Sequence, residues 1–306
     1  MRLLKLSIPF LSLLIACNNN QPSKDTSTDS LNSASISSKK FALAYRDGDN
    51  IVVSSIDTMK QVSFGGATDP AISPDGTKLA YTISDSAGNR NIWVADLEHK
   101  TQAQLPVDNH NHYQAMWSPS GNKIAFSIFD KGNRWKVGVI NTDHSGYQIL
   151  ESKSAIELYS PTWKNEQQLI GHDLTNLYTL DLSGKIIDTQ LLTELIGKDL
   201  SLSSSNRFFY TKDGKKLIFN AGNTDIVKNS VGPNEAIYVL DLASKKTSRI
   251  SPEGLNVPSL YVTADDQIFY SASKTSDSVF KIYTADLNGN IKLLVEKGMS
   301  PTGASK

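Results

Sequence analysis

The sequence predicts an all-β protein, a six-bladed β-propeller with four antiparallel strands in each blade. The first observation is a phrase that returns along the chain: Ile-Ser-Pro-Asp-Gly-Thr-Lys-Leu-Ala-Tyr at 72–81 reappears as 117–126 and, in weaker form, as 210–219. A repeat of roughly 45 residues built from strands and turns is typical of propeller blades. No segment longer than a turn or two has helical periodicity, apart from 191–196.

Two strand patterns give the number of blades, because each occurs six times. One is an apolar strand of the Leu-Ala-Tyr type, and the other is an alternating strand that often ends in Asp-Leu. Alternate residues of a strand face opposite sides of the sheet, so the apolar positions are expected to pack one blade on the next. The first pattern lies at 43–45, 79–81, 124–126, 169–171, 217–219 and 268–270, and the second at 51–54, 92–97, 137–141, 177–182, 237–242 and 282–287.

The turns between these strands have a predictable chemistry. Pro-Asp-Gly is expected to join the innermost strand to the second, since Pro fixes φ and Gly accepts a positive φ. The acid of the Asp-Leu ending falls where the third strand turns into the fourth. There it can cap turn amides, and its repetition favours a structural role, because a catalytic residue is needed only once. These acids are Asp96, Asp181, Asp241 and Asp286.

The ring must also close, and two segments of the chain are candidates for the closing strand. Residues 298–303, Gly-Met-Ser-Pro-Thr-Gly, resemble the start of the cassette that the first repeat lacks. We therefore predict that they supply the inner strand of the first blade. The alternative is that Ser35-Ile36-Ser37 supplies it locally.

The N-terminal residues predict export and lipid attachment. Arg2 and Lys5 precede an apolar run, 8–16, that is too short to span a bilayer. Leu-Ile-Ala-Cys at 14–17 resembles a bacterial lipobox, which implies cleavage after residue 16 and a lipid such as palmitate on Cys17, the only cysteine. We expect 1–16 to be a lipoprotein signal peptide, 17–40 a disordered Ser/Asn-rich tether, and 41–306 the propeller.

The repeat phrases resemble those of the TolB-type propeller family. That family's blade combines aromatic-Ser-Pro-Asp-Gly with a Leu/Ile-Ala-aromatic strand and an Ile-Tyr-x-x-Asp strand, as in 72–81 and 92–96 here. The resemblance covers about 41–303, is closest over 67–150 and is poor over 155–195. It is confined to the propeller, because TolB also has an N-terminal α/β domain, and it implies a TolB-like lipoprotein rather than a full member of the Tol–Pal machinery.

Composition argues against nucleic acid as a partner, and the N-terminal residues indicate where in the cell the protein is found. Equal numbers of Lys plus Arg and of Asp plus Glu leave no basic excess for phosphate contacts, so nucleic acid is not expected as a partner. A single cysteine excludes an intrachain disulfide. With lipid on Cys17, the protein is expected in the bacterial cell envelope. By analogy with enterobacterial lipoproteins, the absence of Asp at position 18 favours the outer membrane, with the domain facing either the periplasm or the surface.

Candidate binding residues lie on one face of the predicted ring. Its longer loops, between second and third strands, and its crossings between blades should gather opposite the Pro-Asp-Gly turns. Variable loops on a rigid scaffold are where binding usually occurs. The longest loop, 220–235, could fold over the mouth of the channel or be a disordered insertion. The candidates on this face are Asp69, His110, His112, Tyr113, Arg134, Trp135 and Asp225.

Two alternatives to simple docking stay open in the sequence. His110 and His112, one residue apart, could bind a metal in an oligosaccharide-active, lyase-like enzyme, although a spacing of two is a weak metal signal. Tryptophans could stack on glycans. Of the four, Trp135 is the best candidate, since Trp93, Trp117 and Trp163 fall at repeat-equivalent strand positions that suit core packing.

The sequence favours a binding module over an enzyme. It has no Gly-x-Ser-x-Gly elbow, Walker loop, His-Glu-x-x-His motif or dinucleotide fingerprint. We therefore predict a monomeric, lipid-anchored protein that docks an envelope protein or peptide on its loop face. No cofactor, metal or catalytic residue is assigned to it.

Overall fold

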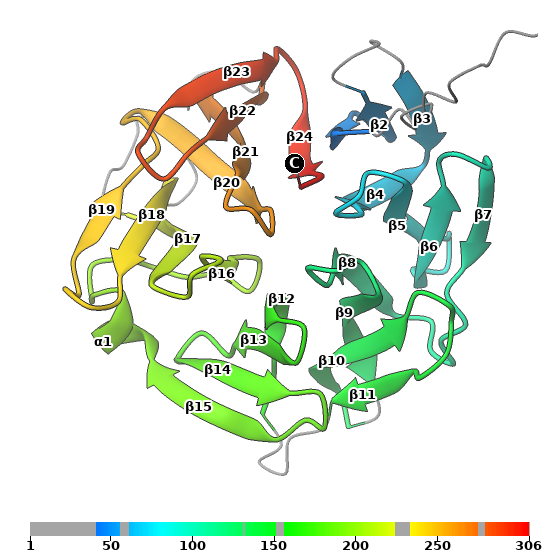
Figure 1. Ribbon diagram of the computed structural model, residues 1–306, viewed down its shortest axis with the longest axis horizontal. Coiled ribbons are helices and arrows are strands. Elements are labelled where there is room, and N and C mark those ends of the chain that lie inside the picture. The colour runs from blue at the N-terminus through cyan, green and yellow to red at the C-terminus, as the bar shows by residue number, and fades with distance from the viewer. Residues whose placement is uncertain are drawn as a thin grey trace, which may run out of the picture. The chain divides into compact units, whose positions relative to one another are not determined.

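A computed structural model describes residues 41–55, 61–130, 132–150, 156–223, 233–274 and 279–305. These residues form six four-stranded antiparallel sheets arranged in a ring about a central axis (Figure 1). This architecture confirms the predicted six-bladed propeller. The one described helix, α1 (Leu192–Leu195), is a single turn, and no helix in the described part of the chain could span a membrane.

The sheets follow one another along the chain as blades 1 to 6. In blades 2 to 6 the first strand in the sequence is innermost, whereas in blade 1 the innermost strand is the C-terminal one. Blade 1 contains β1 (Leu43–Asp47), β2 (Asn50–Ser54), β3 (Gln61–Gly65) and the C-terminal β24 (Met299–Gly303); blade 2 contains β4 (Ala67–Ile72), β5 (Lys78–Ser84), β6 (Arg90–Asp96) and β7 (Thr101–Gln104); blade 3 contains β8 (His112–Trp117), β9 (Lys123–Asp130), β10 (Arg134–Asn141) and β11 (Gln148–Leu150). Blade 4 contains β12 (Tyr159–Asn165), β13 (Gln168–His172), β14 (Asn176–Asp181) and β15 (Ile186–Leu191); blade 5 contains β16 (Phe208–Tyr210), β17 (Lys216–Gly222), β18 (Glu235–Asp241) and β19 (Thr247–Arg249); blade 6 contains β20 (Leu255–Val262), β21 (Ile268–Lys274), β22 (Lys281–Ala285) and β23 (Ile291–Val295).

The ring closes through its C-terminal strand, as predicted. β24 is the innermost strand of blade 1 and pairs antiparallel with β1, with Leu43 opposite Gly303. The Ile72 amide of blade 2 donates to Thr302 Oγ1 at 3.2 Å, and the Ser305 amide donates to the Pro74 carbonyl at 2.9 Å. The alternative closing segment, Ser35–Ser37, lies outside the described residues.

Neighbouring blades are joined by apolar packing and by buried hydrogen bonds from the inner strands. The Trp117 indole donates to the Ala71 carbonyl of the preceding blade at 2.7 Å, and the Trp163 indole donates to the Met116 carbonyl at 2.9 Å. Both tryptophans are buried, which agrees with the predicted core packing. The Thr162 hydroxyl of blade 4 donates to the Phe208 carbonyl of the following blade.

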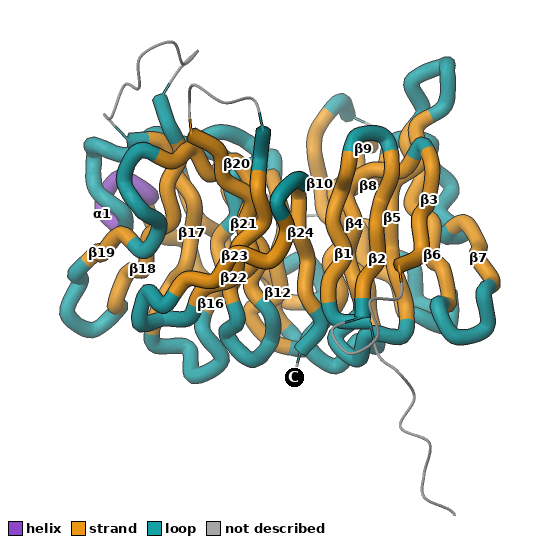
Figure 2. Tube along the Cα trace, turned by 90° about the horizontal axis from the view of Figure 1, so that it is seen from above, coloured by secondary structure: helices purple, strands orange, loops and turns teal. Residues whose placement is uncertain are grey.

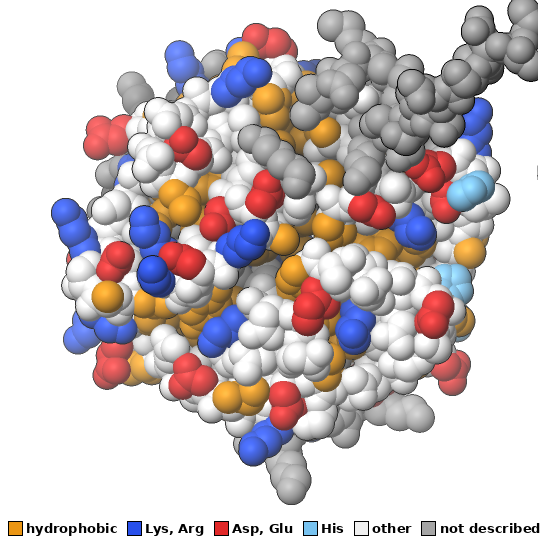
Figure 3. All heavy atoms as spheres, viewed as in Figure 1, with side chains coloured by type: hydrophobic (Ala, Val, Ile, Leu, Met, Phe, Trp, Pro, Cys, Tyr) orange, Lys and Arg blue, Asp and Glu red, His pale blue; other side chains and the backbone are white. Residues whose placement is uncertain are grey.

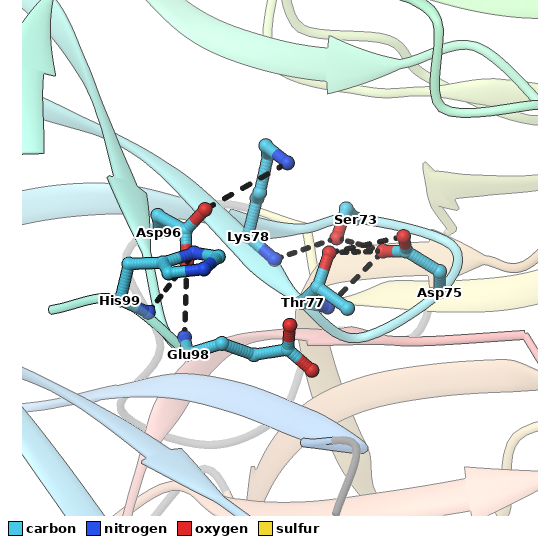
Figure 4. Close-up of polar contacts among 7 residues, drawn as sticks. All are labelled: Ser73, Asp75, Thr77, Lys78, Asp96, Glu98 and His99. Carbon is cyan, nitrogen blue, oxygen red and sulfur yellow. Dashed lines mark hydrogen bonds and ion pairs between the residues drawn. The ribbon is translucent and has the colours of Figure 1, made fainter. Parts of the chain in front are cut away.

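The repeated turns are held by their own side chains (Figure 4). Ser73 Oγ donates to Asp75 Oδ1 at 2.6 Å and accepts from the Lys78 amide at 2.9 Å. Asp96 Oδ1 accepts from the amides of Glu98 and His99 at 3.0 and 2.8 Å. The corresponding acids Asp181, Asp241 and Asp286 also accept from amides two to four residues on, so their predicted capping role is confirmed.

The two faces of the ring carry different connections. The turn face has the turns between first and second strands and between third and fourth strands, and the C-terminal end of the described chain lies on this side (Figure 2). The loop face, opposite, has the loops between second and third strands and the crossings between blades. In Figure 3, viewed as in Figure 1, hydrophobic side chains show between polar ones around the middle of the ring. Beneath them a depression of about 480 Å³ is lined by residues that include Trp117, Trp163, Phe209 and Tyr261.

Candidate functional site

An aromatic and cationic cluster lies on the loop face at blades 2 and 3. The Arg90 guanidinium, at the start of β6, stacks over the Tyr113 ring, with its central carbon 3.7 Å from the ring centroid and 5.4 Å from that of Trp135. The Tyr113 and Trp135 rings meet edge to face at 5.4 Å, and Phe129 packs on Trp135 at 4.9 Å. All four side chains are half-buried. We call Arg90, Tyr113, Phe129 and Trp135 the aromatic platform.

The platform is positioned by the polar crossing from blade 2 to blade 3. Asn111 Oδ1 accepts from Nε and an Nη of Arg90 at 2.9 and 2.6 Å, which fixes the plane of the guanidinium. Asn109 Oδ1 accepts from the Asn111 amide at 2.6 Å, and its Nδ2 donates to the Phe129 carbonyl at 3.0 Å. The asparagines of this crossing therefore orient the platform, a role the sequence did not reveal.

His112 does not belong to the accessible site and is removed from the candidate binding residues. It is fully buried between blades 2 and 3, where its Nδ1 accepts from the Ile92 amide at 3.3 Å and its ring packs near Phe126. Burial is the main cause that lowers its pKa to about 4, so the imidazole is neutral. Strand alternation explains the placement, because His112 and Tyr113 are adjacent in β8 and point to opposite faces.

A two-histidine metal site is not formed by these side chains. His110 is exposed on the crossing, whereas the accepting nitrogen of His112 is occupied by a backbone amide. No group of three His, Cys, Asp or Glu side chains arranged to hold a metal occurs among the described residues.

The central channel opens beside the platform and is polar. A cavity of about 180 Å³ is lined by residues in or next to the inner strands of several blades, including Asp69, Gln114, Arg207 and Ser300. Asp69, Gln114 and Ser300 have φ of 49°, 58° and 49°, and each lies at a β-bulge of its inner strand. Non-glycine residues rarely adopt such angles, so the inner strands hold strained residues where they line the channel.

Asp69 and Arg207 are the charged groups of this cavity. They come from blades 2 and 5, on opposite sides of the ring, and interact electrostatically across the channel. Burial raises the pKa of Asp69, and the positive charges of Arg207, Arg90 and Arg46 offset part of that rise. Burial likewise lowers the pKa of Arg207.

Acidic groups continue around the mouth on blades 4 and 5. Tyr159 donates to Glu157 in a short hydrogen bond that contributes most to raising the tyrosine pKa to about 12. Glu235 Oε2 accepts from the side-chain amides of Asn206 and Asn220 at 3.0 and 2.7 Å. Burial raises the pKa of Glu235, while these two hydrogen bonds lower it.

The predicted candidates thus fall into four groups. Tyr113 and Trp135 meet in the platform, with Arg134 half-buried at the start of β10 beside them, and His110 is exposed on the adjoining crossing. Asp69 lines the channel, and His112 lies in the core. Asp225, most of the loop 220–235, and Cys17 lie outside the described residues. Arg90, Asn111 and Arg207 are the site residues that sequence reasoning missed.

The remaining tryptophan, Trp93, borders a different hollow. A groove of about 810 Å³ runs between blades 1 and 2, with Val62, Phe64, Tyr81 and Ile83 also in its walls. Trp93 is therefore a half-buried packing residue at the outer part of the ring and is separate from the loop-face site.

Comparison with known proteins shows the fold. No protein-family model and no curated protein matches the chain. Its structure is similar to TolB from Acinetobacter baumannii, with 15% identity and a TM-score of 0.62 over 87% of this chain and 66% of that chain. An Agrobacterium tumefaciens protein named as a TolB gives 13% identity and 0.57 over 86% of this chain and 92% of that one.

The propeller is also similar to part of an enzyme. A Mycobacterium tuberculosis puromycin-hydrolyzing peptidase matches with 14% identity and a TM-score of 0.54 over 84% of this chain, but over only 44% of the peptidase chain. The TolB-like six-bladed propeller that the repeats predicted is therefore confirmed as the fold, and the fold is shared by proteins of different activity.

Proposed function

We propose that this protein is a lipid-anchored docking protein of the bacterial cell envelope, whose propeller binds a protein or peptide on its loop face without catalysis. The observation that carries this proposal is the aromatic platform. Tyr, Trp and Arg are the residue types that dominate binding energy in protein interfaces, especially where they are held rigid and half-buried. Arg90 is held by two hydrogen bonds before any partner arrives, which reduces the entropy cost of ordering it.

The chemistry of the site supports binding over catalysis. The site consists of stacked side chains, hydrogen bonds between amides and carbonyls, and an arginine whose guanidinium is fixed in one plane. The buried histidine nearest the site is neutral and hydrogen-bonded to the backbone, so it does not reach the surface to act on a ligand.

Membrane attachment is a separate part of the proposal. It is supported by the lipobox-like Leu-Ile-Ala-Cys at 14–17 and by the polar composition of 18–40. We place the anchor in the outer membrane, with the propeller as a monomer facing the periplasm or the surface. Labelling of growing cells with radioactive palmitate tests it: the wild-type protein is expected to incorporate label and the Cys17→Ser variant none.

Docking is tested by purifying tagged full-length protein from gently solubilised envelopes and identifying what co-purifies. A specific protein should be recovered with wild type and lost with the Tyr113→Ala/Trp135→Ala double variant. Tyr210→Ala is the matched control, because Tyr210 is also a half-buried aromatic residue with a cation over its ring, but it lines the turn-face depression. Equal recovery with wild type and the double variant would exclude the platform as the docking site.

Glycan binding is the second candidate, and the same platform favours it, since aromatic rings also stack on sugars. Retention of envelope glycan fragments by wild type, with no protein recovered, would replace the first proposal by this one.

A further inference from the structure

The channel holds an arginine whose guanidinium has no hydrogen-bond acceptor among the residues that the structure describes. The Arg207 amide donates to Asn220 Oδ1 at 3.1 Å, but among the described residues the guanidinium donates to no protein oxygen. A guanidinium has five N–H donors, and removing it from bulk water without acceptors is costly. Channel water or a ligand must therefore satisfy these donors.

Asp69, across the channel, does not accept the hydrogen bonds that the Arg207 guanidinium can donate. The two residues attract each other electrostatically, but they form no ion pair within 4.0 Å in the described structure. Arg46 and Arg90 also act on the Asp69 carboxylate from the mouth. The Asp69 carboxylate is thus shared among three guanidinium groups and does not by itself balance the charge of Arg207.

The other two arginines already have partners, so Arg207 is the one prepared for a ligand. Arg90 donates twice to Asn111, and Arg46 donates to the Gly48 carbonyl at 2.8 Å and lies 3.9 Å from Asp49. Around Arg207 the cavity wall offers neutral hydrogen-bonding side chains from Gln114, Ser205 and Ser300. If one oxygen of an anion accepts from Arg207, these neutral groups can donate to its other oxygen without adding charge to the site.

The size of the cavity limits what can enter. About 180 Å³ accommodates one side chain or one chain terminus and is too small for a folded segment. Tyr113 links this cavity to the platform, because it lies under Arg90 and also interacts electrostatically with Arg207. A partner on the platform can therefore extend one residue into the channel.

We infer that Arg207 binds a carboxylate that a peptide partner inserts into the channel from the loop face, either an acidic side chain or the C-terminal carboxylate. A planar guanidinium fits a carboxylate in a two-point geometry that a lysine does not reproduce. This inference rests on the proposed docking function for the source of the carboxylate, but it concerns a different residue and can be tested apart from it.

The test uses full-length protein and four short probes: Ac-Gly-Gly-Glu-NH2, its Gln counterpart, Ac-Gly-Gly-Gly with a free C-terminus, and sodium acetate. Binding is followed by NMR titration. The Glu probe or the free-terminus probe is expected to bind at least tenfold more tightly than the Gln probe, and whichever binds identifies the source of the carboxylate. If acetate binds as tightly as either peptide, the site is a small-anion site and the peptide source is wrong.

Variants distinguish a ligand-binding role of Arg207 from a purely structural interaction with Asp69 across the channel. Arg207→Gln should abolish the preference for the carboxylate probe, and Arg207→Lys should restore only a small part of it. Asp69→Asn should strengthen binding several-fold, because it removes the competing carboxylate. Lys215→Gln, which removes an exposed cation on the turn face that does not line the cavity, is the control and should bind as wild type does.

The outcomes distinguish this inference from the docking proposal. Equal binding of the Glu, free-terminus and Gln probes, or a preference that survives Arg207→Gln, would overturn the carboxylate site. Should Arg207→Gln fail to fold, an unchanged affinity in Asp69→Asn overturns it equally. Full recovery of an envelope partner by folded Arg207→Gln, together with its loss in the Tyr113/Trp135 double variant, would leave docking intact and the carboxylate site refuted.

Discussion

The two faces of this ring are built on different rules. On the turn face the same interactions return in blade after blade: Ser73 with Asp75, Thr211 with Asp213 and Thr263 with Asp265 all hold the same kind of turn. On the loop face the interactions differ between blades, with a stacked arginine at Tyr113, a tyrosine–carboxylate bond at Tyr159 and a carboxylate held by asparagines at Glu235. Repetition marks what every blade needs to fold, and departure from it marks where binding can evolve.

The largest expected effect is on ring closure at the turn-face end of β24. A Cβ at Gly303 would lie 2.1 Å from the Phe269 ring, so Gly303→Ala should lower the free energy of unfolding by about 3 kcal/mol. Urea unfolding measures this change. The Gly303→Ala/Phe269→Leu double variant should recover part of the loss, and a wild-type midpoint for Gly303→Ala would contradict closure by this strand.

A loop-face substitution should act on binding rather than on stability. Trp135→Ala removes the centre of the platform and is expected to weaken partner binding by about 2 kcal/mol, roughly thirtyfold. Its melting temperature should stay within a few degrees of wild type, because Trp135 is half-buried at a strand end. Surface plasmon resonance with the purified partner measures the affinity; a stability loss without an affinity loss would reverse our assignment of the two faces.

Acid should weaken the core beneath the loop face. His112 has a pKa of about 4 in the folded protein, below its ordinary value of 6.5, so the unfolded chain binds the proton more tightly. The stability that the neutral His112 contributes is complete above pH 6.5 and is lost as the pH falls toward 4. At pH 5 the loss in the free energy of unfolding is about 2 kcal/mol. Burial lowers the pKa of His172 in the same direction.

The control for this pH dependence is His112→Gln, which keeps an acceptor but cannot titrate. Thermal unfolding between pH 5 and pH 7.5 should show a shallower slope for the variant than for wild type. Identical slopes would mean that His112 does not stay neutral in the folded protein.

The smallest effect is expected from a single turn. Ser73→Ala removes a hydroxyl that donates to Asp75 and accepts from the Lys78 amide, and should cost about 1 kcal/mol of stability. Partner affinity should not change, since this turn is on the other face of the ring. A loss of affinity in Ser73→Ala, at a temperature where it is fully folded, would show that the turn face takes part in docking.

The sequence predicted the parts of this protein that repeat. Strand positions, turn chemistry, the capping acids and closure by 299–303 follow from local patterns, so they could be found even in blade 4, where the phrase is poor. The site is harder because its contacts join different blades. Arg207 and Asp69 interact electrostatically only because blades 5 and 2 face each other across the channel, and nothing in the sequence near either residue indicates this interaction. The burial of His112 could not be predicted either, because the face of the sheet on which it lies depends on the residue at which β8 begins.

The central claim is that partners dock on the loop face, and site-specific photocrosslinking tests it most directly. A photoreactive amino acid is placed at His110, exposed on the loop face beside the platform, or at Lys215, exposed on the turn face, and cells are irradiated before the envelope is extracted. We predict a discrete crosslinked product from position 110 and none from position 215. A product from position 215 alone would contradict the claim and move the docking site to the turn face.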